Sequence, residues 1–243
     1  MIGAMDLGAV PREHRSPALI DQLLRDRDAI VARIAAGKDL MAITRTMIAT
    51  IAITMAIVGA ALGSYRGGIQ IGYAAIKLPL VMIGTAALSA PALTAIGAAL
   101  GRRSRLTADL ALVITALAYG ALLLVACTPL ILLGRAIDLS YHQMILSTVA
   151  MFSVAGVASL RMVARARSCE TGPGRTSAMF GLCVVFALVG GQLAWSLRPY
   201  LLRPRTPDVP FLRYTEGSLF DAITGAIRSA RGIYTRDSAP LGD

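Results

Sequence analysis

The sequence predicts an all-α membrane protein, a polytopic bundle of about five transmembrane helices with amphipathic helices at both termini. Apolar residues make up 56% of the 243 positions and the mean hydropathy is +0.65, whereas soluble domains are typically about 45–50% apolar. Aromatic residues contribute only 5%. This composition favours helices that pack through small residues over the alternating strands and aromatic girdles of an outer-membrane barrel.

The net charge of +10 is concentrated between the apolar segments. Residues 46–199 carry eleven Lys/Arg against three Asp/Glu, which accounts for eight of the ten excess charges. Basic connections between apolar spans are typical of membrane proteins, because positive loops stay on the cytoplasmic side. The chain shows no nucleic-acid motif and no basic face interleaved with aromatic residues. We therefore expect the lipid bilayer, and not a nucleic acid, as its environment.

Residues 1–45 are predicted to form an N-terminal cytoplasmic tail that contains an amphipathic helix. Ser16 and Pro17 form a favourable helix start, apolar residues then recur at helical spacing as far as Ile34, and Gly37 can end the helix. Such a helix can lie on the membrane, bind a partner or dock on the protein's own loops. The tail lacks an apolar core of signal-peptide length, so the first span is expected to direct membrane insertion.

Residues 46–198 are predicted to form the transmembrane domain. The expected spans lie near residues 46–64, 71–100, 110–133, 142–160 and 177–197. In the first span Gly59 and Gly63 stand one turn apart, which permits close approach of another helix, and the same five-letter pattern returns at residues 97–101. We interpret both glycine pairs as helix ends that pack closely on a neighbouring helix.

Segment 71–100 is too long for one straight span of about twenty residues and too short for two. It is either one kinked span or a re-entrant pair, and Pro79 and Pro91 are the expected kink positions. Pro129 is the expected kink position of the third span. Lys77, just before Pro79, falls inside the apolar region, where a charge is unfavourable unless it snorkels or finds a partner.

The distribution of arginine predicts the orientation in the membrane. The second and fourth connections are arginine-rich, with Arg102, Arg103, Arg105, Arg161, Arg165, Arg167 and Arg175. We expect these connections and the N-terminus to be cytoplasmic, and five spans then place the C-terminus outward. Trp195 and Arg198 suit interfacial anchors at the outward end of the fifth span. Residues 199–243 follow as a Pro-rich exit segment and a short C-terminal amphipathic helix.

Groups that can perform chemistry are sparse in this chain. The spans contain no carboxylate pair and no histidine cluster, and there is no phosphate loop or dinucleotide motif, so we expect no enzyme activity, metal site or cofactor. The cysteines are expected to be packing residues. The polar groups in or near the spans are Lys77, Asp109, Asp138, His142, Gln192 and Arg198. Lys77 and Gln192 lie deepest and are predicted to meet near Pro79, so replacing Lys77 should disturb the protein more than replacing Arg66.

The chain resembles a group of bacterial polytopic inner-membrane proteins to which no activity is assigned. The resemblance covers most of residues 70–221. It is carried by Lys77-Leu78-Pro79-Leu80, Pro91-Ala92-Leu93, Cys127-Thr128-Pro129, Gln192-Leu193-Ala194-Trp195-Ser196-Leu197-Arg198-Pro199 and Glu216-Gly217-Ser218-Leu219-Phe220. The five-span count and the basic, proline-interrupted layout are also similar to Yip1-like membrane proteins. Both resemblances imply a multi-pass membrane protein and transfer no catalytic residue.

We expect a structural, assembly or accessory role in the inner membrane, exerted by binding a membrane-protein partner or a second copy of the chain. The alternative is a channel or transporter subunit, in which the proline-kinked spans and the intramembrane Lys77 line a path. One chain offers few polar residues to line a pore, which favours the first expectation.

Overall fold

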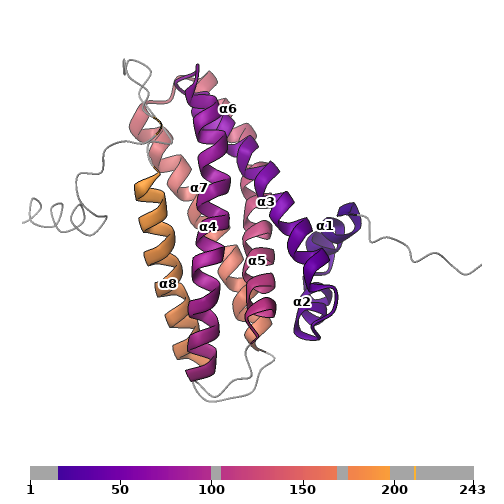
Figure 1. Cartoon of the computed structure of the whole chain (residues 1–243). Coiled ribbons are helices and arrows are strands. Elements are labelled where there is room, and N and C mark those ends of the chain that lie inside the picture. The colour runs from indigo at the N-terminus through magenta and orange to yellow at the C-terminus, as the bar shows by residue number, and fades with distance from the viewer. Residues whose placement is uncertain (1–15, 100–104, 169–174, 198–210, 212–243) are drawn as a thin grey trace, which may run out of the picture.

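The computed structural model describes residues 16–99, 105–168, 175–197 and 211, and the regular elements of this part of the chain are all α-helices (Figure 1). The helices are α1 (Ser16–Arg25), α2 (Arg27–Ala35), α3 (Leu40–Gly63), α4 (Gln70–Ala99), α5 (Leu106–Ala126), α6 (Thr128–Ala136), α7 (Tyr141–Ser168) and α8 (Arg175–Ser196). The predicted all-α bundle is confirmed. The expected C-terminal amphipathic helix lies outside the described residues.

Four helical segments are long and apolar enough to cross a bilayer, which makes the chain a membrane protein. They are Leu40–Gly63, Gln70–Ala99, Leu106–Ala136 and Gln143–Ala166. Each has at least the roughly twenty residues that a hydrocarbon core of about 30 Å requires. The fifth expected span corresponds to α8, whose apolar stretch among the described residues is the shorter Cys183–Ala194. A fifth crossing by α8 therefore remains a prediction.

The prolines act differently in the two helical segments that contain them. α4 continues from Gln70 to Ala99 with Pro79 and Pro91 inside it, so segment 71–100 is one helix and not a re-entrant pair. The third segment is interrupted, because α5 ends at Ala126 and Pro129 lies in the first turn of α6. A proline suits that position, since the first turn of a helix needs no internal N–H donor.

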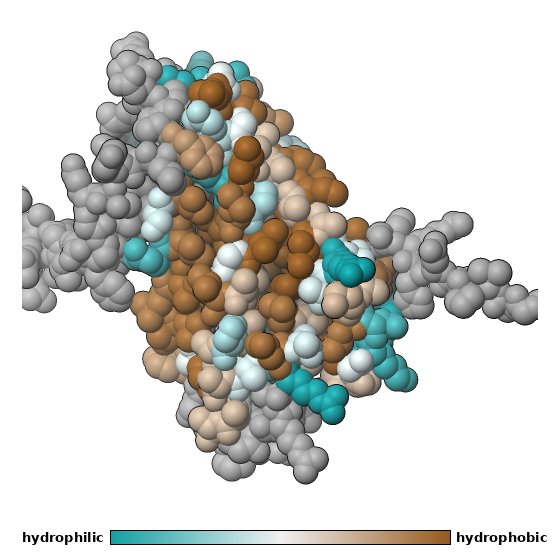
Figure 2. All heavy atoms as spheres, in the orientation of Figure 1, coloured by the Kyte–Doolittle hydropathy of each residue, from teal (hydrophilic) through white to brown (hydrophobic). Residues whose placement is uncertain are grey.

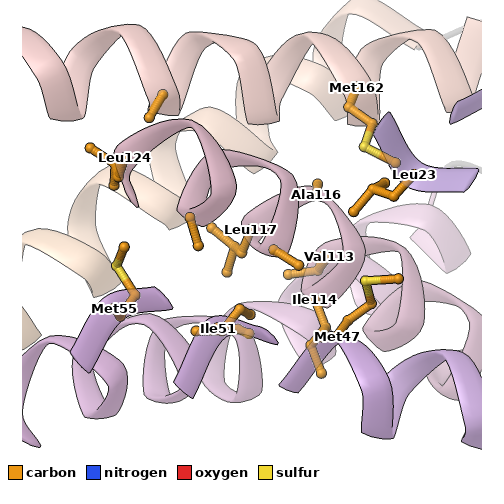
Figure 3. Close-up of a cluster of buried hydrophobic side chains, with 14 of the residues drawn as sticks. Leu23, Met47, Ile51, Met55, Val113, Ile114, Ala116, Leu117, Leu124 and Met162 are labelled. Carbon is orange, nitrogen blue, oxygen red and sulfur yellow. The ribbon is translucent and has the colours of Figure 1, made fainter. Parts of the chain in front are cut away.

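α5 lies at the centre of the bundle. It packs against α3, α4 and α7, while α4 lies between α3 and α8 (Figure 1). Apolar side chains from α3 and α5 face each other in the core, among them Met47, Ile51, Val113, Ile114 and Leu117 (Figure 3). The most apolar stretch of the α5–α6 segment is 56% buried. The mostly aliphatic core is what a sequence rich in Ala, Leu, Ile and Met predicts.

The N-terminal tail forms a helical hairpin, α1–α2, in place of the single helix expected. Asp26 breaks the helix because its backbone is not helical (φ −140°, ψ 74°) and its carboxylate accepts a hydrogen bond from the Ala29 N–H at 3.1 Å, which caps α2. Gly37, at φ +71°, ends α2, and Lys38 N–H bonds the Arg33 carbonyl at 3.0 Å. The glycine at this helix end is thus where it was predicted.

The apolar side of this α1–α2 hairpin is buried against the bundle. Leu19, Leu23, Ile30 and Ile34 are at most 3% exposed and belong to the common core. Figure 3 shows Leu23 beside Met162 of α7. Arg33 reaches Gln22 at 3.1 Å and Asp39 at 2.7 Å, so it ties α1, α2 and the start of α3 together. The sequence left three surfaces open for this segment: the membrane, a partner, or the protein's own loops. The structure shows it docked on the protein itself, against helices of the bundle.

Large apolar side chains point outward from the spanning helices. Examples are Ile53 of α3, Leu88 of α4, Leu146 and Val154 of α7 and Phe180 of α8. Figure 2 shows hydrophobic residues over most of the described surface of the bundle on this face, with hydrophilic residues gathered at one end and around the hairpin. Such a surface is suited to contact with lipid, since acyl chains solvate apolar side chains.

Candidate functional site

Lys77 is the most unusual side chain of the bundle. It lies on α4 two residues before Pro79 and is 0% exposed, although it carries a long cationic side chain. Lysine is almost never fully buried in proteins unless it is paired. The sequence singled out Lys77 for its depth in the span, and the structure places it inside the protein and not at a lipid-facing boundary.

A pair of aromatic rings lies beside Lys77, and one of them contacts its ammonium. Its Nζ lies 4.8 Å from the centre of the Phe211 ring, a cation–π contact. Tyr73, one turn earlier on α4, meets the same ring edge to face at 5.0 Å and 84°. Phe211 therefore links the exit segment to the beginning of α4, and we call Lys77, Tyr73 and Phe211 the lysine–aromatic cluster.

The sequence interpretation missed Phe211. Phe211 follows Pro210 in the exit segment, and an aromatic residue directly after a row of prolines is a usable signal. Prolines stiffen the chain and limit how far it moves, so an aromatic ring beyond them can be held against a nearby helix. Nothing in the local pattern, however, indicates which helix that is.

The position of α4 is fixed by glycines of α3. A Cβ added at Gly59 would overlap the backbone carbonyl of Ala74, and one added at Gly63 would lie 2.5 Å from the Gln70 carbonyl oxygen. Because the two backbones touch, only glycine fits at both positions. The predicted close approach at this glycine pair matches the structure, and it places the turn of α4 that carries Tyr73 and Lys77. Of the second pair, Gly97 is buried in α4 and Gly101 lies outside the described residues.

Gln192 lies at a different level of the bundle from Lys77. Its own side chain is exposed on α8, while the adjacent Leu193 contacts Gly84 of α4. Gly84 follows Lys77 by seven residues, which is about 10 Å along a helix that rises 1.5 Å per residue. The contact described at the Lys77 ammonium comes from Phe211. The meeting of Lys77 with Gln192 near Pro79 stays a prediction.

The other positions singled out at this end are only partly described. Trp195 is in α8, but its side-chain environment is outside the description, and Arg198 lies beyond the described residues. Asp138 is exposed with φ +52° at the connection before α7. The expected anchoring roles of Trp195 and Arg198 stay predictions.

Several hydroxyl groups within the spans bond their own helix. Thr50, Thr54, Thr115, Thr148 and Ser159 each donate to the carbonyl four residues earlier, at 2.6–3.0 Å. Asp109 is only 6% exposed and accepts a hydrogen bond from Thr94 at 2.9 Å, which joins α4 to the first turn of α5. These groups join turns and helices.

Metal-ligating side chains are scattered over the described part of the chain. In this part of the chain no three His, Cys, Asp or Glu side chains lie close enough to hold a metal ion. The five serine and threonine hydroxyls named above donate to backbone carbonyls, and Cys127 and Cys183 are thiols without a disulfide. The arrangement can hold a buried cation against an aromatic ring and can join helices.

The chain was also compared with known proteins. No protein-family model, curated protein or solved structure matches it.

Proposed function

We propose that this protein is a structural, assembly or accessory component of its membrane that acts by binding another membrane-spanning helix through α7. The observation that carries the proposal is that hydropathy and exposure do not go together in the spanning segments, which we call the inversion. Of the four spanning segments, α7 is the least hydrophobic and also the most exposed: 17% of its most apolar stretch is buried, against 56% in α3 and in the α5–α6 segment.

This inversion is unfavourable in a chain surrounded only by lipid. A helix that faces acyl chains gains nothing from small or polar side chains, whereas a helix that packs on another helix does, because backbones then approach closely. The N-terminal half of α7, which we call its outer half, exposes Val149, Ala150 and Ser153 together. We therefore place the partner helix on this outer half of α7.

The lysine–aromatic cluster supports an accessory role over a channel or transporter. A residue that lines a path must present its polar group to water or solute. The Lys77 side chain is instead 0% exposed, and its ammonium contacts Phe211 of the same chain. We propose that Lys77 holds the exit segment on α4 and that the protein has no chemistry of its own.

Cysteine cross-linking in native membranes tests the proposed face. Val149→Cys on α7 should give a disulfide- or maleimide-linked product, and its mass distinguishes a second copy of the chain from another protein. Ile57→Cys on α3 is the matched control, because Ile57 is 47% exposed and Val149 is 56% exposed, both in apolar surroundings. Equal cross-linking at the two positions would show only random collisions and would contradict the proposal.

Solute flux tests the alternative directly. Purified protein in liposomes should not accelerate ion or solute movement beyond empty vesicles. Flux that disappears on Lys77→Met but persists on Arg66→Met would establish a channel or transporter and overturn the accessory role. Both variants remove one cation from the same half of the chain, so a general effect of charge is controlled.

We also propose that the protein lies in a bacterial inner membrane with its N-terminus in the cytoplasm. The positive connections support this orientation. In Figure 1 the ends of α4, α5, α7 and α8 that flank the two basic connections lie at one end of the bundle. In a chain with Cys127→Ala and Cys183→Ala, Cys169 should react with an impermeant thiol reagent only after the membrane is opened. Reaction in intact cells would reverse the orientation.

A further inference from the structure

A pocket of about 420 Å³ lies where the α1–α2 hairpin docks on the bundle. It is lined by Arg27, Asp28 and Val31 of α2, by Tyr119 of α5 and by a face of α7 that includes Arg161, Met162 and Arg165. Three guanidinium groups and one carboxylate give this lining an excess of two positive charges. We call it the arginine pocket, and the proposed partner binding does not use it.

Arg27 is held in place by Tyr119. Its Nη1 donates to the Tyr119 hydroxyl at 2.8 Å, and its guanidinium carbon lies 4.9 Å from the centre of the same ring. A guanidinium carries five N–H donors in a planar fork that matches phosphate oxygens. Arg27 is thus oriented before any ligand binds, which lowers the entropy lost on binding.

Arg161 and Arg165 stand one helical turn apart on α7 and are exposed. The structure shows no hydrogen bond or ion pair of Arg161 with the described part of the chain. An arginine at the wall of a pocket that has no protein partner among the described residues is suited to bind an anion from outside. Arg161 and Arg165 are like charges at i and i+4, and an anion bound at Arg161 offsets the repulsion between them.

The depth of the pocket matches the boundary of a bilayer. Arg161 follows Tyr141 by twenty residues, which is about 30 Å along a helix and equals the thickness of a typical hydrocarbon core. Counted from Tyr141 at one boundary, Arg161 lies near the other, toward the end of the spanning segment Gln143–Ala166 and within reach of lipid headgroups. Apart from Asp28 and the Tyr119 hydroxyl, the rest of the lining is apolar, with Met162 only 6% exposed and Val31 and Ala158 half-buried.

The geometry points to a binding site for the phosphate of an anionic lipid in this arginine pocket. The three arginines bind the phosphate oxygens, and the apolar lining of Val31, Ala158 and Met162 covers the first carbons of the lipid. Basic pockets between membrane helices at the positively charged side of a bundle bind lipid headgroups in this way. The bound lipid then joins α2 to α7 at the place where the hairpin meets the bundle.

Native mass spectrometry of the full chain in detergent micelles tests this site. Added phosphatidylglycerol should remain bound in preference to phosphatidylcholine. Arg161→Gln should weaken phosphatidylglycerol binding about tenfold, as expected for loss of a hydrogen bond between charged groups. Arg161 makes no hydrogen bond or ion pair with the described part of the chain, so this variant should fold normally, which its thermal melting without lipid verifies.

Arg135→Gln is the matched control, because Arg135 is also exposed but lies in the last turn of α6, next to the start of α7. It should leave binding unchanged. An equal loss in both variants would show nonspecific attraction to a basic protein and would overturn the site. Asp28→Asn should tighten binding, because it removes the negative charge of the lining; weaker binding would mean that the carboxylate contacts the ligand, and would overturn the assignment of an anion.

Competition with inorganic phosphate or glycerol phosphate shows whether the bound phosphate group belongs to a lipid or to a soluble anion. If the pocket requires the lipid, millimolar concentrations of either anion should not displace phosphatidylglycerol. Displacement at such concentrations, lost again in Arg161→Gln, would show that the pocket binds soluble phosphate and would contradict the lipid source.

Discussion

α4 is packed between two helices in two different ways. Toward α3, the glycines 59 and 63 bring backbone against backbone, so that an added Cβ would meet carbonyl groups and Cα atoms. Toward α8, the nearest atoms to the glycines are ends of side chains: Leu193 Cδ1 at 3.3 Å from a Cβ at Gly84, and Thr85 Cγ2 at 3.4 Å from one at Gly190. Backbones cannot yield, whereas side-chain ends can.

The difference teaches which part of the molecule is fixed. The α3–α4 pair forms a rigid frame with α5, and this frame sets the place of the lysine–aromatic cluster. α8 rests on that frame through adaptable contacts, and the interface buries the hydroxyl of Thr85, for which the described residues provide no hydrogen-bond partner. Sub-ångström adjustments are therefore easier at α8 than at α3.

The largest expected effect is at Gly59. Gly59→Ala should lower the free energy of unfolding by about 3 kcal/mol, because the added methyl forces α3 and α4 apart. SDS titration in mixed micelles, followed by circular dichroism, measures this change. Gly72→Ala is the control, since no atom lies within 4 Å of its added Cβ, and it should not destabilise the chain. Wild-type stability of Gly59→Ala would mean that the two backbones are not in contact.

The next effect is the coupling between Lys77 and Phe211. In a double-mutant cycle with Lys77→Met and Phe211→Leu, the interaction energy should be about 1–2 kcal/mol, as for a partly desolvated cation–π pair. The same cycle with Phe180→Leu should give almost none, because Phe180 adjoins Gly181, which contacts the far end of α4 at Ile96. Equal coupling in both cycles would contradict the cluster. Lys77→Met should also destabilise the chain more than Arg66→Met.

Features that repeat along the helix were predictable from the sequence. Apolar runs of spanning length predicted a helical bundle. Two glycines one turn apart predicted the surface of α3 on which another helix packs closely, and that helix is α4. The depth of Lys77 within an apolar run also identified it as unusual. These predictions rest on local periodicity, which neighbouring residues alone determine.

Features that depend on the path of the chain were not predictable. Phe211 is distant from Lys77 in sequence, so their contact depends on where the exit segment runs. The break at Asp26 required a choice between continuing one helix and capping a second one, and both suit the composition of that segment. The arginine pocket combines α2, α5 and α7, and no local pattern indicates that these helices meet.

Thr85 provides a smaller test of the adaptable interface. Its Oγ1 is buried without a hydrogen-bond partner among the described residues. Thr85→Val should therefore stabilise the protein by about 1 kcal/mol, since an unsatisfied hydroxyl is replaced by a methyl group. Thr54→Val is the matched control, because the Thr54 hydroxyl donates to the Thr50 carbonyl at 2.7 Å, and it should give no gain. A loss of stability in Thr85→Val would reveal a hydrogen bond across to α8.

The smallest expected effect is at Gly190, and it tests most directly the difference between the α3–α4 and α4–α8 interfaces. Its added Cβ would lie 3.4 Å from Thr85 Cγ2 and 3.5 Å from Thr85 Oγ1, which are ordinary van der Waals distances. Gly190→Ala should therefore change the free energy of unfolding by no more than about 0.5 kcal/mol, because the better helix propensity of alanine offsets any crowding. A loss as large as that of Gly59→Ala, in the same SDS titration, would mean that α8 is held as firmly as α3. The frame would then include α8, and adjustments of the bundle would have to occur at α7.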